Sequence, residues 1–324
     1  MLTSLLKEVS RSFYLTLRIL PRPIRSQIGL AYLLARTSDT IADTEVLPLQ
    51  TRLGALRGFR DALDGTGGPL TLSNFLKEQA NVADRTLIQH ATEAVSLLDS
   101  FEADDKQRIR SLLGVIISGQ ELDLLRFGTG SHGQIKSLKR DEELDDYTYR
   151  VAGCVGEFWT HMCLAHLDGP PPDADRLVAK GIRFGKGLQM VNILRDLPAD
   201  LLNGRCYLPG EELNHLGLKP ADLLSSERES ALRPLYNRYL DQARDHLHAG
   251  WEYTLDLPSH WKRVRLACSW PVLIGLATLQ KLRQEPILDA SRRIKISRSE
   301  VRGILVRSVL TYPFKTKWKH LVAI

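Results

Sequence analysis

Carboxylates recur at helical spacing on two apolar segments of the chain. In the first segment, "YLLARTSDTIADT", Asp39 and Asp43 lie four residues apart. At about 100° per residue, Tyr32 and Arg36 share a helix face with them. Such a face is typical either of surface salt bridges from Arg36 to the two aspartates or of a ligand-binding site. This segment alone does not separate the two interpretations.

The second segment, "GKGLQMVNILRDLPADLLNGRCYLP", repeats the pattern. Gln189, Asn192, Asp196 and Asp200 lie on one face if the helix is continuous. Pro198 removes one helical hydrogen bond, so we expect it to kink or end the helix. The position of Asp200 is therefore predicted less directly than those of Asn192 and Asp196.

Electrostatics indicates what these two acidic faces would bind. Two carboxylates about 5 to 6 Å apart repel by roughly 3 kcal/mol at an effective dielectric constant near 20, so two such pairs in one cavity require cations. Hard oxygen ligands without histidine or cysteine favour Mg²⁺, which completes its coordination with water and substrate phosphates. The faces therefore predict a Mg²⁺-bound phosphate ester, with Arg36, Arg195 and Arg205 as candidates for contacts to the phosphate oxygens. Nucleotide phosphoryl transfer of a familiar type is not expected, because the chain has no Gly-rich P-loop and no kinase signature.

A third segment, "YTYRVAGCVGEFWTHM", places a phenol above an apolar stripe. By itself it indicates a core helix with a tyrosine at its solvent end. If this segment lies beside the two acidic faces that are predicted to bind Mg²⁺, the stripe would instead line a hydrocarbon pocket. Tyr147 would then lie at the boundary between hydrocarbon and diphosphate. Small residues here and at Gly185 and Gly187 would allow close approach of a backbone or a ligand. The stripe consists of Val151, Val155, Phe158 and Met162, and its small neighbours are Ala152, Gly153 and Gly156.

Helices are expected to position these residues. Apolar residues recur at helical spacing almost everywhere, and alternating runs of strand length are scarce. The pattern predicts an all-α globule of about ten long helices around a central cavity. Residues 1–324 are expected to form one domain, because no linker or repeat interrupts them. The stretch "SHGQIKSLK" is either a mobile loop with little structure or an ordinary surface connection. Helix breaks are expected at Pro21/Pro23, Gly65–Gly68, Gly128–Gly133, Gly169–Pro172, Gly204–Pro209, Pro220 and Pro258.

Composition limits the compartment and the class of protein. The chain is 43% apolar, which suffices for a large core. Its four cysteines include no CxxC pair, so neither a disulfide framework nor a zinc site is expected, and a reducing cytosol fits. The first residues contain no apolar core of signal-peptide length. The uncharged run Leu266–Gln280 has 15 residues, whereas a membrane span needs about 20. An integral membrane protein is therefore not expected.

The chain carries a net charge of +6, with the excess visible near its end. Basic proteins bind nucleic acid, anionic lipid or phosphorylated substrates. No zinc finger or aromatic RNA-binding strand accompanies the charge, so nucleic acid is not an expected partner. A membrane-surface patch or a solvated basic face explains it better. We expect a cytoplasmic protein, peripheral at the inner face of the membrane, and infer no protein partner.

Four segments together resemble the squalene and phytoene synthases, the trans-prenyltransferases that join two prenyl diphosphates head to head. They are "VSRSFYLTLRILP", "YLLARTSDTIADT", "YTYRVAGCVG" and "NILRDLPAD". The second contains a DxxxD motif and the fourth an NxxxDxxxD motif. The resemblance extends over most of the chain. It implies an all-α isoprenoid-synthase fold with a large central cavity.

The resemblance also implies roles for individual residues. Catalysis would depend on Tyr147 and on three of the aspartates, Asp39, Asp43 and Asp196. Val151, on the apolar stripe, would contact the hydrocarbon part of the substrate. The residues implied to bind Mg²⁺ are Asp39, Asp43, Asn192, Asp196 and Asp200, and those implied near the diphosphate or lining the cavity are Ser10, Arg11, Ser12, Phe13, Tyr32, Arg36, Gln189, Arg195 and Arg205.

Two later segments bear on the branch of the family. "RLACSWPVLIGLATLQKLR" and "ASRRIKISRSEV" look more like squalene synthases, which convert two farnesyl diphosphates to presqualene diphosphate and reduce it with NADPH. The alternative is a phytoene or dehydrosqualene synthase, which omits the reduction. No Rossmann GxGxxG is present, so a nicotinamide site would be non-standard. A remote alternative is a non-catalytic helical protein that binds membrane surfaces. The predicted substrate is farnesyl diphosphate, and the sequence does not settle the choice between 15-carbon and 20-carbon chains.

Overall fold

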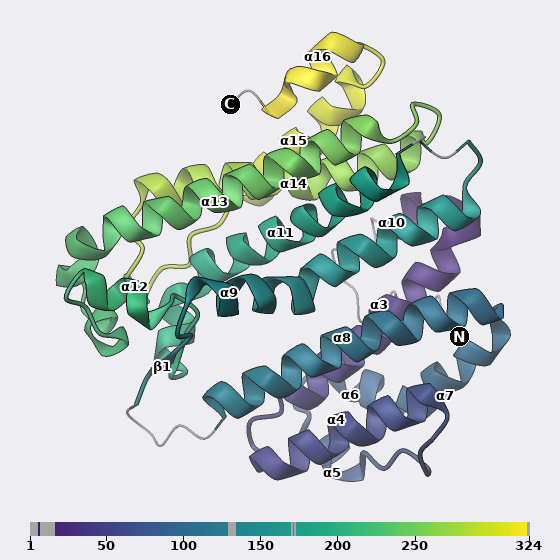
Figure 1. Cartoon of the computed structure of the whole chain (residues 1–324), viewed down its shortest axis with the longest axis horizontal. Helices are drawn as coiled ribbons and strands as arrows, with labels where there is room; N and C mark the ends of the chain where they lie inside the picture. The colour runs from purple at the N-terminus through teal and green to yellow at the C-terminus, as the bar shows by residue number, and fades with distance from the viewer. Residues whose placement is uncertain (1–5, 7–16, 129–133, 170, 172, 323–324) are drawn as a thin grey trace. The chain divides into compact units, whose positions relative to one another are not determined.

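The computed structural model describes residues 6, 17–128, 134–169, 171 and 173–322, and these are predominantly helical (Figure 1). The expected all-α class is thereby confirmed. Contacts divide the chain into two compact units, and each is described by itself. The first comprises Met1–Thr129 with His161–Asp168, and the second comprises Gly130–Thr160 with Gly169–Ile324.

The first unit is built around α3 (Arg22–Ala42), which packs against α4, α6, α7 and α8. Its helix begins directly after Pro21, as expected from the proline pair, because proline tolerates the first turn of a helix. Gly65 ends α4 in the left-handed conformation, with φ of 73°. The other elements are α4 (Leu49–Asp64), α5 (Ser73–Glu78), α6 (Val82–Gln89), α7 (Ala91–Ser96), η1 (Leu97–Ser100) and α8 (Ala103–Phe127).

In the second unit the three long helices α11, α13 and α14 lie side by side (Figure 1). The C-terminal part of α10 belongs to the first unit. The elements before the third long helix are β1 (Lys136–Ser137), α9 (Asp141–Thr148), η2 (Tyr149–Gly153), α10 (Cys154–His166), α11 (Ala174–Leu202), β2 (Arg205–Cys206), α12 (Gly210–His215), η3 (Pro220–Leu224), η4 (Ser226–Arg228) and α13 (Glu229–Asp256). The remaining elements are α14 (Lys262–Gln284), α15 (Arg298–Thr311), α16 (Lys315–Lys319) and η5 (His320–Val322).

Pro198 does not end the second acidic helix, so that part of the expectation is wrong. α11 continues to Leu202. The proline lacks the N–H that would bond the carbonyl of Leu194. The fully buried hydroxyl of Tyr236, on α13, donates to that carbonyl at 2.9 Å instead. A tertiary hydrogen bond therefore replaces the missing helical one, and Asp200 lies on the same helix as Asp196.

Tyr236→Phe is expected to lower the free energy of unfolding by about 1–3 kcal/mol, because it leaves the buried Leu194 carbonyl without its donor. Urea denaturation followed by circular dichroism measures this. Tyr312→Phe is the matched control, since its hydroxyl donates to the carbonyl of Ser259 in an exposed setting at 3.2 Å. Equal effects of the two substitutions would contradict the role assigned to Tyr236.

Glycines bring the third segment into backbone contact with α11, as expected. A Cβ at Gly185 would overlap the carbonyl oxygen of Ala152, and one at Gly156 would overlap the carbonyl oxygen of Gly181. Gly187 similarly lies against the backbone of α13. The close approach that these glycines allow is therefore made by protein backbone.

The apolar stripe of the third segment is not continuous, which corrects the prediction. Residues 149–153 form a π-helical turn, which contains more residues per turn than an α-helix. α-Helical spacing therefore fails across it. Val155 is 40% exposed, whereas Phe158 and Met162 are buried. Val151 lies within the turn itself and is partly exposed.

Part of the stretch "SHGQIKSLK" has regular structure. β1 pairs in parallel with β2. The N–H of Lys136 donates to the carbonyl of Gly204 at 3.0 Å, and that of Leu138 donates to Cys206 at 3.1 Å. The expectation of a loop with little structure is therefore wrong for residues 136–138, while residues 131–133 lie outside the described part.

No helix among the described residues is long and apolar enough to cross a bilayer.

Candidate functional site

The first acidic face lies on α3 of the first unit. Tyr32, Arg36 and Asp39 belong to the helix, and Asp43 is its C-cap, whose N–H donates to the carbonyl of Asp39 at 2.8 Å. The helical spacing read from the sequence therefore holds for all four residues. The neighbouring motif residues Ser10, Arg11, Ser12 and Phe13 lie outside the described part of the chain.

Arg36 does not bridge mainly to its own helix. Its Nη2 donates to Oδ1 of Asp84, on α6, at 3.1 Å. Its Nη1 lies 3.9 Å from Oδ2 of Asp39. One interpretation of the sequence was that Arg36 forms salt bridges mainly to Asp39 and Asp43. This is wrong, because its shortest salt bridge is to Asp84 on another helix. Asp84 was missed because helical spacing reveals only neighbours on the same helix.

The negative charge of Asp39 is only partly offset by Arg36 and Gln120. Burial and then the Asp43 charge raise its pKa to about 6, against the lowering effects of Arg36 and of a hydrogen bond from Gln120. That bond joins Gln120 Nε2, on α8, to Asp39 Oδ1 at 2.6 Å. Gln120 is only 7% exposed, and its Oε1 has no hydrogen-bond partner among the described residues. Burial also raises the pKa of Tyr32, with Arg36 opposing and Asp39 adding to the shift.

Gln120→Leu is expected to raise the pKa of Asp39 above its value of about 6, because the substitution removes a hydrogen bond that stabilises the carboxylate. Carboxyl ¹³C NMR titration of the metal-free protein measures it. Gln107→Leu, on the same helix, is the control, since Gln107 bonds only to the exposed Ser111 among the described side chains. An unchanged pKa of Asp39 in Gln120→Leu would show that the hydrogen bond from Gln120 does not stabilise the carboxylate.

The second acidic face lies on α11 of the second unit. Gln189, Asn192, Asp196 and Asp200 all belong to this helix. The Asn192 Nδ2 donates to Gln189 Oε1 at 3.3 Å. This confirms that the four polar residues occupy one helix, as the sequence pattern predicts.

Asp196 is neutralised by two arginines. Arg195 donates to its two oxygens at 2.9 and 2.5 Å, and Arg293 does so at 3.1 and 3.2 Å. Burial alone would raise the pKa of Asp196, but the hydrogen bonds and charges of Arg195 and Arg293 outweigh it and lower the pKa. Part of the positive charge that the electrostatic argument from the sequence requires is therefore supplied at Asp196 by the protein itself. Arg293, 97 residues away along the chain, was missed as a partner.

Tyr147 lies in an aromatic pair in the second unit. Its ring stacks on that of Tyr207, with centroids 4.7 Å apart and planes at 23°. Both side chains are buried. Tyr207 follows β2, the strand that contains Arg205. The stack fixes the orientation of the Tyr147 ring, and sequence spacing gave no sign of it.

The two acidic faces fit a divalent cation unequally. Among the described residues, no group of three or more His, Cys, Asp or Glu side chains could hold a metal ion by itself. On α3, the raised pKa of Asp39 and the unpartnered Gln120 Oε1 fit a hydrated Mg²⁺, which needs only one or two carboxylates and several waters. On α11, a cation would have to compete with Arg195 and Arg293 for Asp196.

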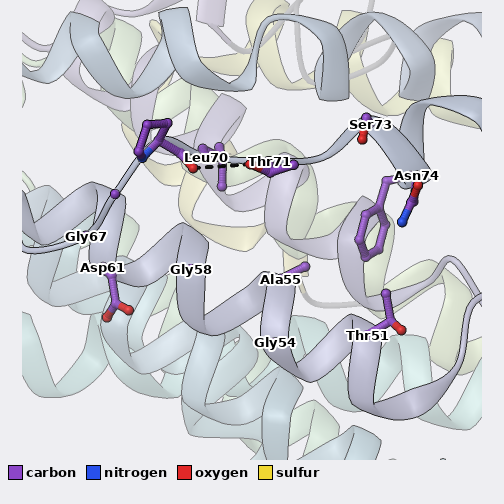
Figure 2. Close-up of a pocket in the computed structure, with 13 residues that line it drawn as sticks. Thr51, Gly54, Ala55, Gly58, Asp61, Gly67, Leu70, Thr71, Ser73 and Asn74 are labelled. Atoms are coloured by element: carbon purple, nitrogen blue, oxygen red, sulfur yellow. Dashed lines mark hydrogen bonds between the residues drawn. The ribbon is translucent and has the colours of Figure 1, made fainter.

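A separate pocket of about 340 Å³ opens between α4 and the loop that follows it (Figure 2). Figure 2 shows Gly54, Ala55 and Gly58 along the helix, opposite Leu70 and Thr71 on the loop. Its lining includes none of the residues expected from the sequence to bind substrate or metal. The pocket therefore plays no part in the function proposed below.

Known proteins resemble this chain over nearly its whole length. The family model "Squalene/phytoene synthase" matches residues 6–300. A phytoene synthase of Mycobacterium bovis is 29% identical over 302 residues, covering 91% of this chain and 84% of the relative. The chain spans about two fifths of the length of fungal relatives named bifunctional lycopene cyclase/phytoene synthase, such as that of Colletotrichum graminicola, where 39% is covered.

Solved structures share the fold. A dehydrosqualene synthase superposes with a TM-score of 0.69 at 21% identity, covering 97% of this chain and 95% of the other. The squalene synthase HpnC of Alicyclobacillus acidocaldarius gives 0.62 at 17% identity, covering 87% and 93%. These likenesses confirm the isoprenoid-synthase fold. Together with the motifs on α3 and α11, the match over residues 6–300 shows that the chain belongs to the squalene/phytoene synthase family of head-to-head prenyltransferases.

Proposed function

We propose that this enzyme condenses two prenyl diphosphates head to head and releases the hydrocarbon without reducing it. The observation that carries the proposal is its likeness to a phytoene synthase over 91% of the chain. We therefore favour the non-reductive reaction, the alternative in the sequence analysis, over squalene synthesis. It also favours geranylgeranyl over farnesyl diphosphate, since phytoene contains two 20-carbon chains.

The acidic faces are proposed to hold the diphosphate end of the substrate through Mg²⁺. When bound, Mg²⁺ would supply positive charge that stabilises the leaving diphosphate. Asp39 and Asp43 on α3, and Asn192, Asp196 and Asp200 on α11, would hold it. Arg36, Arg195 and Arg205 are proposed to donate hydrogen bonds to diphosphate oxygens.

Tyr147 is proposed to orient the reacting chains or to relay the proton that is lost when the cyclopropane closes. Its ring is held by the stack on Tyr207. A hydroxyl fixed in this way would act at one position of the substrate. Tyr32, in the first unit, and Gln189, in the second, are also proposed to contact the substrate, and Val151 is proposed to contact its hydrocarbon part.

Tyr147→Phe is expected to lower kcat about a hundredfold, because it removes the hydroxyl and keeps the aromatic stack. Steady-state product formation, measured by mass spectrometry, tests this. Tyr207→Phe is the control: it also removes one phenol hydroxyl while keeping the stack, and it should change kcat far less. Wild-type kcat in Tyr147→Phe would exclude the hydroxyl from the reaction.

The proposed function is tested by incubating the purified protein with Mg²⁺ and either geranylgeranyl or farnesyl diphosphate, with and without NADPH. A forty-carbon polyene that forms equally in both cofactor conditions supports the proposal. Formation of dehydrosqualene from farnesyl diphosphate would support the non-reductive reaction but would identify farnesyl diphosphate as the substrate. Squalene that forms only with NADPH would overturn it.

Squalene synthesis with farnesyl diphosphate and NADPH is the second candidate. One observation favours it. The segment "ASRRIKISRSEV", which resembles the reductive branch, contributes Arg293 to the hydrogen bonds on Asp196. The segment thus contacts the proposed diphosphate site, where a reductive step would take place.

We further propose that the enzyme works in the cytoplasm, against the inner face of a membrane. Its four cysteines are buried, and none forms a disulfide within the described part of the chain, which suits a reducing compartment. A hydrocarbon product partitions into lipid, so release at a membrane surface avoids transfer through water.

A further inference from the structure

Positive charge is concentrated in the last 34 residues of the chain. Nine of the 44 Lys and Arg residues lie in 291–324, but only one of the 38 Asp and Glu residues. This segment therefore carries a net charge of +8, and the preceding 290 residues together carry −2. The basic character of the protein is thus a property of one segment.

One side of this segment is fixed to the long helices of the second unit. The Trp270 Nε1, on α14, donates to Ser308 Oγ at 2.9 Å. The Trp251 Nε1, on α13, donates to the carbonyl of Lys319 at 3.1 Å, and its ring packs on Trp318 with centroids 4.9 Å apart. The guanidinium of Arg265 lies 4.8 Å above the same Trp318 ring. α15 and α16 are therefore held in a defined orientation.

The other side exposes apolar side chains. Val306 is 51% exposed, Val309 47%, Leu310 67% and Phe314 59%. They are four of the eleven large apolar residues that are exposed in the described part of the chain, and they lie within nine residues. At about 100° per residue, the three on α15 share one face with Arg302. Exposed apolar residues clustered in this way indicate an interaction surface.

Basic residues surround this apolar face. Arg298 and Arg302 lie on the same side of α15, and Arg307 follows Val306. Lys315 and Lys317 follow Phe314, and all five cationic side chains are on exposed residues. An apolar face rimmed by cations is complementary to a bilayer with anionic headgroups. A second copy of the chain is a poorer occupant, because a two-fold contact would place two segments of charge +8 against each other.

We propose that the α15–α16 face, made of Val306, Val309, Leu310 and Phe314 with Arg298, Arg302, Arg307, Lys315 and Lys317, docks on anionic lipid bilayers. The apolar side chains enter the headgroup region, and the cations pair with lipid phosphates. The face then sets which side of the second unit meets the membrane. This inference does not depend on the reaction proposed above, and its test contains no substrate.

Vesicle co-sedimentation of the full chain tests the proposal. The vesicles contain phosphatidylcholine alone or equal parts of phosphatidylcholine and phosphatidylglycerol. Wild type should bind the anionic vesicles at least about tenfold more tightly, and high salt should weaken the binding. Leu310→Glu should weaken it about tenfold, and so should the double substitution Arg302→Gln with Arg307→Gln.

Val82→Glu is the matched control, because Val82 is 78% exposed on α6 and receives the same change as Leu310. It should bind like wild type, and circular dichroism shows that each variant is folded. Equal binding to neutral and anionic vesicles would overturn the proposal, as would equal losses in Leu310→Glu and Val82→Glu. Sedimentation velocity measures whether the protein dimerises. If wild type forms a dimer that Leu310→Glu dissociates, and if it does not bind vesicles, the face would be a contact with a second copy of the chain instead.

Discussion

Asp39→Asn is expected to lower kcat/KM by at least about a thousandfold. The substitution removes a carboxylate proposed to hold Mg²⁺ and keeps the shape of the side chain and an acceptor for Gln120. The charge at this position is costly in the metal-free protein, since its pKa is raised to about 6. Stability contributed by such a group is present at low pH and is lost as pH rises through 6. Asp39→Asn should therefore unfold at the same urea concentration as wild type at pH 7, or at a higher one.

The measurement is the Mg²⁺ dependence of kcat/KM between pH 5 and 8, together with urea denaturation. Wild type should need more Mg²⁺ for half-maximal activity as pH drops below about 6, because protons compete with the cation for the carboxylate. Asp104→Asn is the control, since this α8 side chain is 87% exposed and should leave activity unchanged. Wild-type kcat/KM in Asp39→Asn would exclude this carboxylate from catalysis.

Asp105→Ala is expected to lower the free energy of unfolding by about 3–5 kcal/mol, the largest effect on stability among these substitutions. Asp105 lies in the first turn of α8 with its side chain only 3% exposed. His166 Nε2 and Arg108 Nη1 contact its Oδ1 at 2.8 and 3.0 Å, and Gln27 Nε2 contacts Oδ2 at 3.1 Å. Alanine would leave these three polar groups without their common partner.

Urea denaturation at several pH values measures this effect. Burial alone would raise the pKa of Asp105, but hydrogen bonds from His166, Gln27 and Arg108 outweigh it and lower the pKa. The stability that Asp105 contributes is therefore present above pH 4 and is lost as pH falls through its lowered pKa. Wild type and variant should converge at acid pH. The neighbouring Asp104→Ala should cost less than about 0.5 kcal/mol, and a similar loss in both variants would contradict the role of the buried contacts.

Helical spacing predicted the two acidic faces because it depends only on positions along one helix. The Asp39 and Asp196 faces were found in this way, and the structure keeps each on a single helix. The same rule could not supply partners from other helices. Asp84 and Gln120 beside the first face, and Arg293 beside the second, are distant in sequence and became visible only when the chain was folded.

Local departures from the ideal helix were also beyond the sequence pattern. Pro198 was expected to kink or end its helix, yet α11 continues to Leu202, where the Tyr236 hydroxyl replaces the missing donor to the Leu194 carbonyl. The π-helical turn at 149–153 shifts the residues after it, so Val155 points outward despite its apolar spacing. In both places packing between helices decided the outcome, and packing is not encoded in the spacing of one segment.

Two prenyl diphosphates are proposed to become one hydrocarbon on this protein. Quantifying the diphosphate released and the hydrocarbon extracted from a single reaction of the purified enzyme with geranylgeranyl diphosphate and Mg²⁺ tests this stoichiometry. We expect two diphosphates for each forty-carbon hydrocarbon and neither product when EDTA is added. One diphosphate for each prenyl alcohol, with no forty-carbon product from this substrate and no thirty-carbon product from farnesyl diphosphate, would show simple hydrolysis and would contradict the proposal.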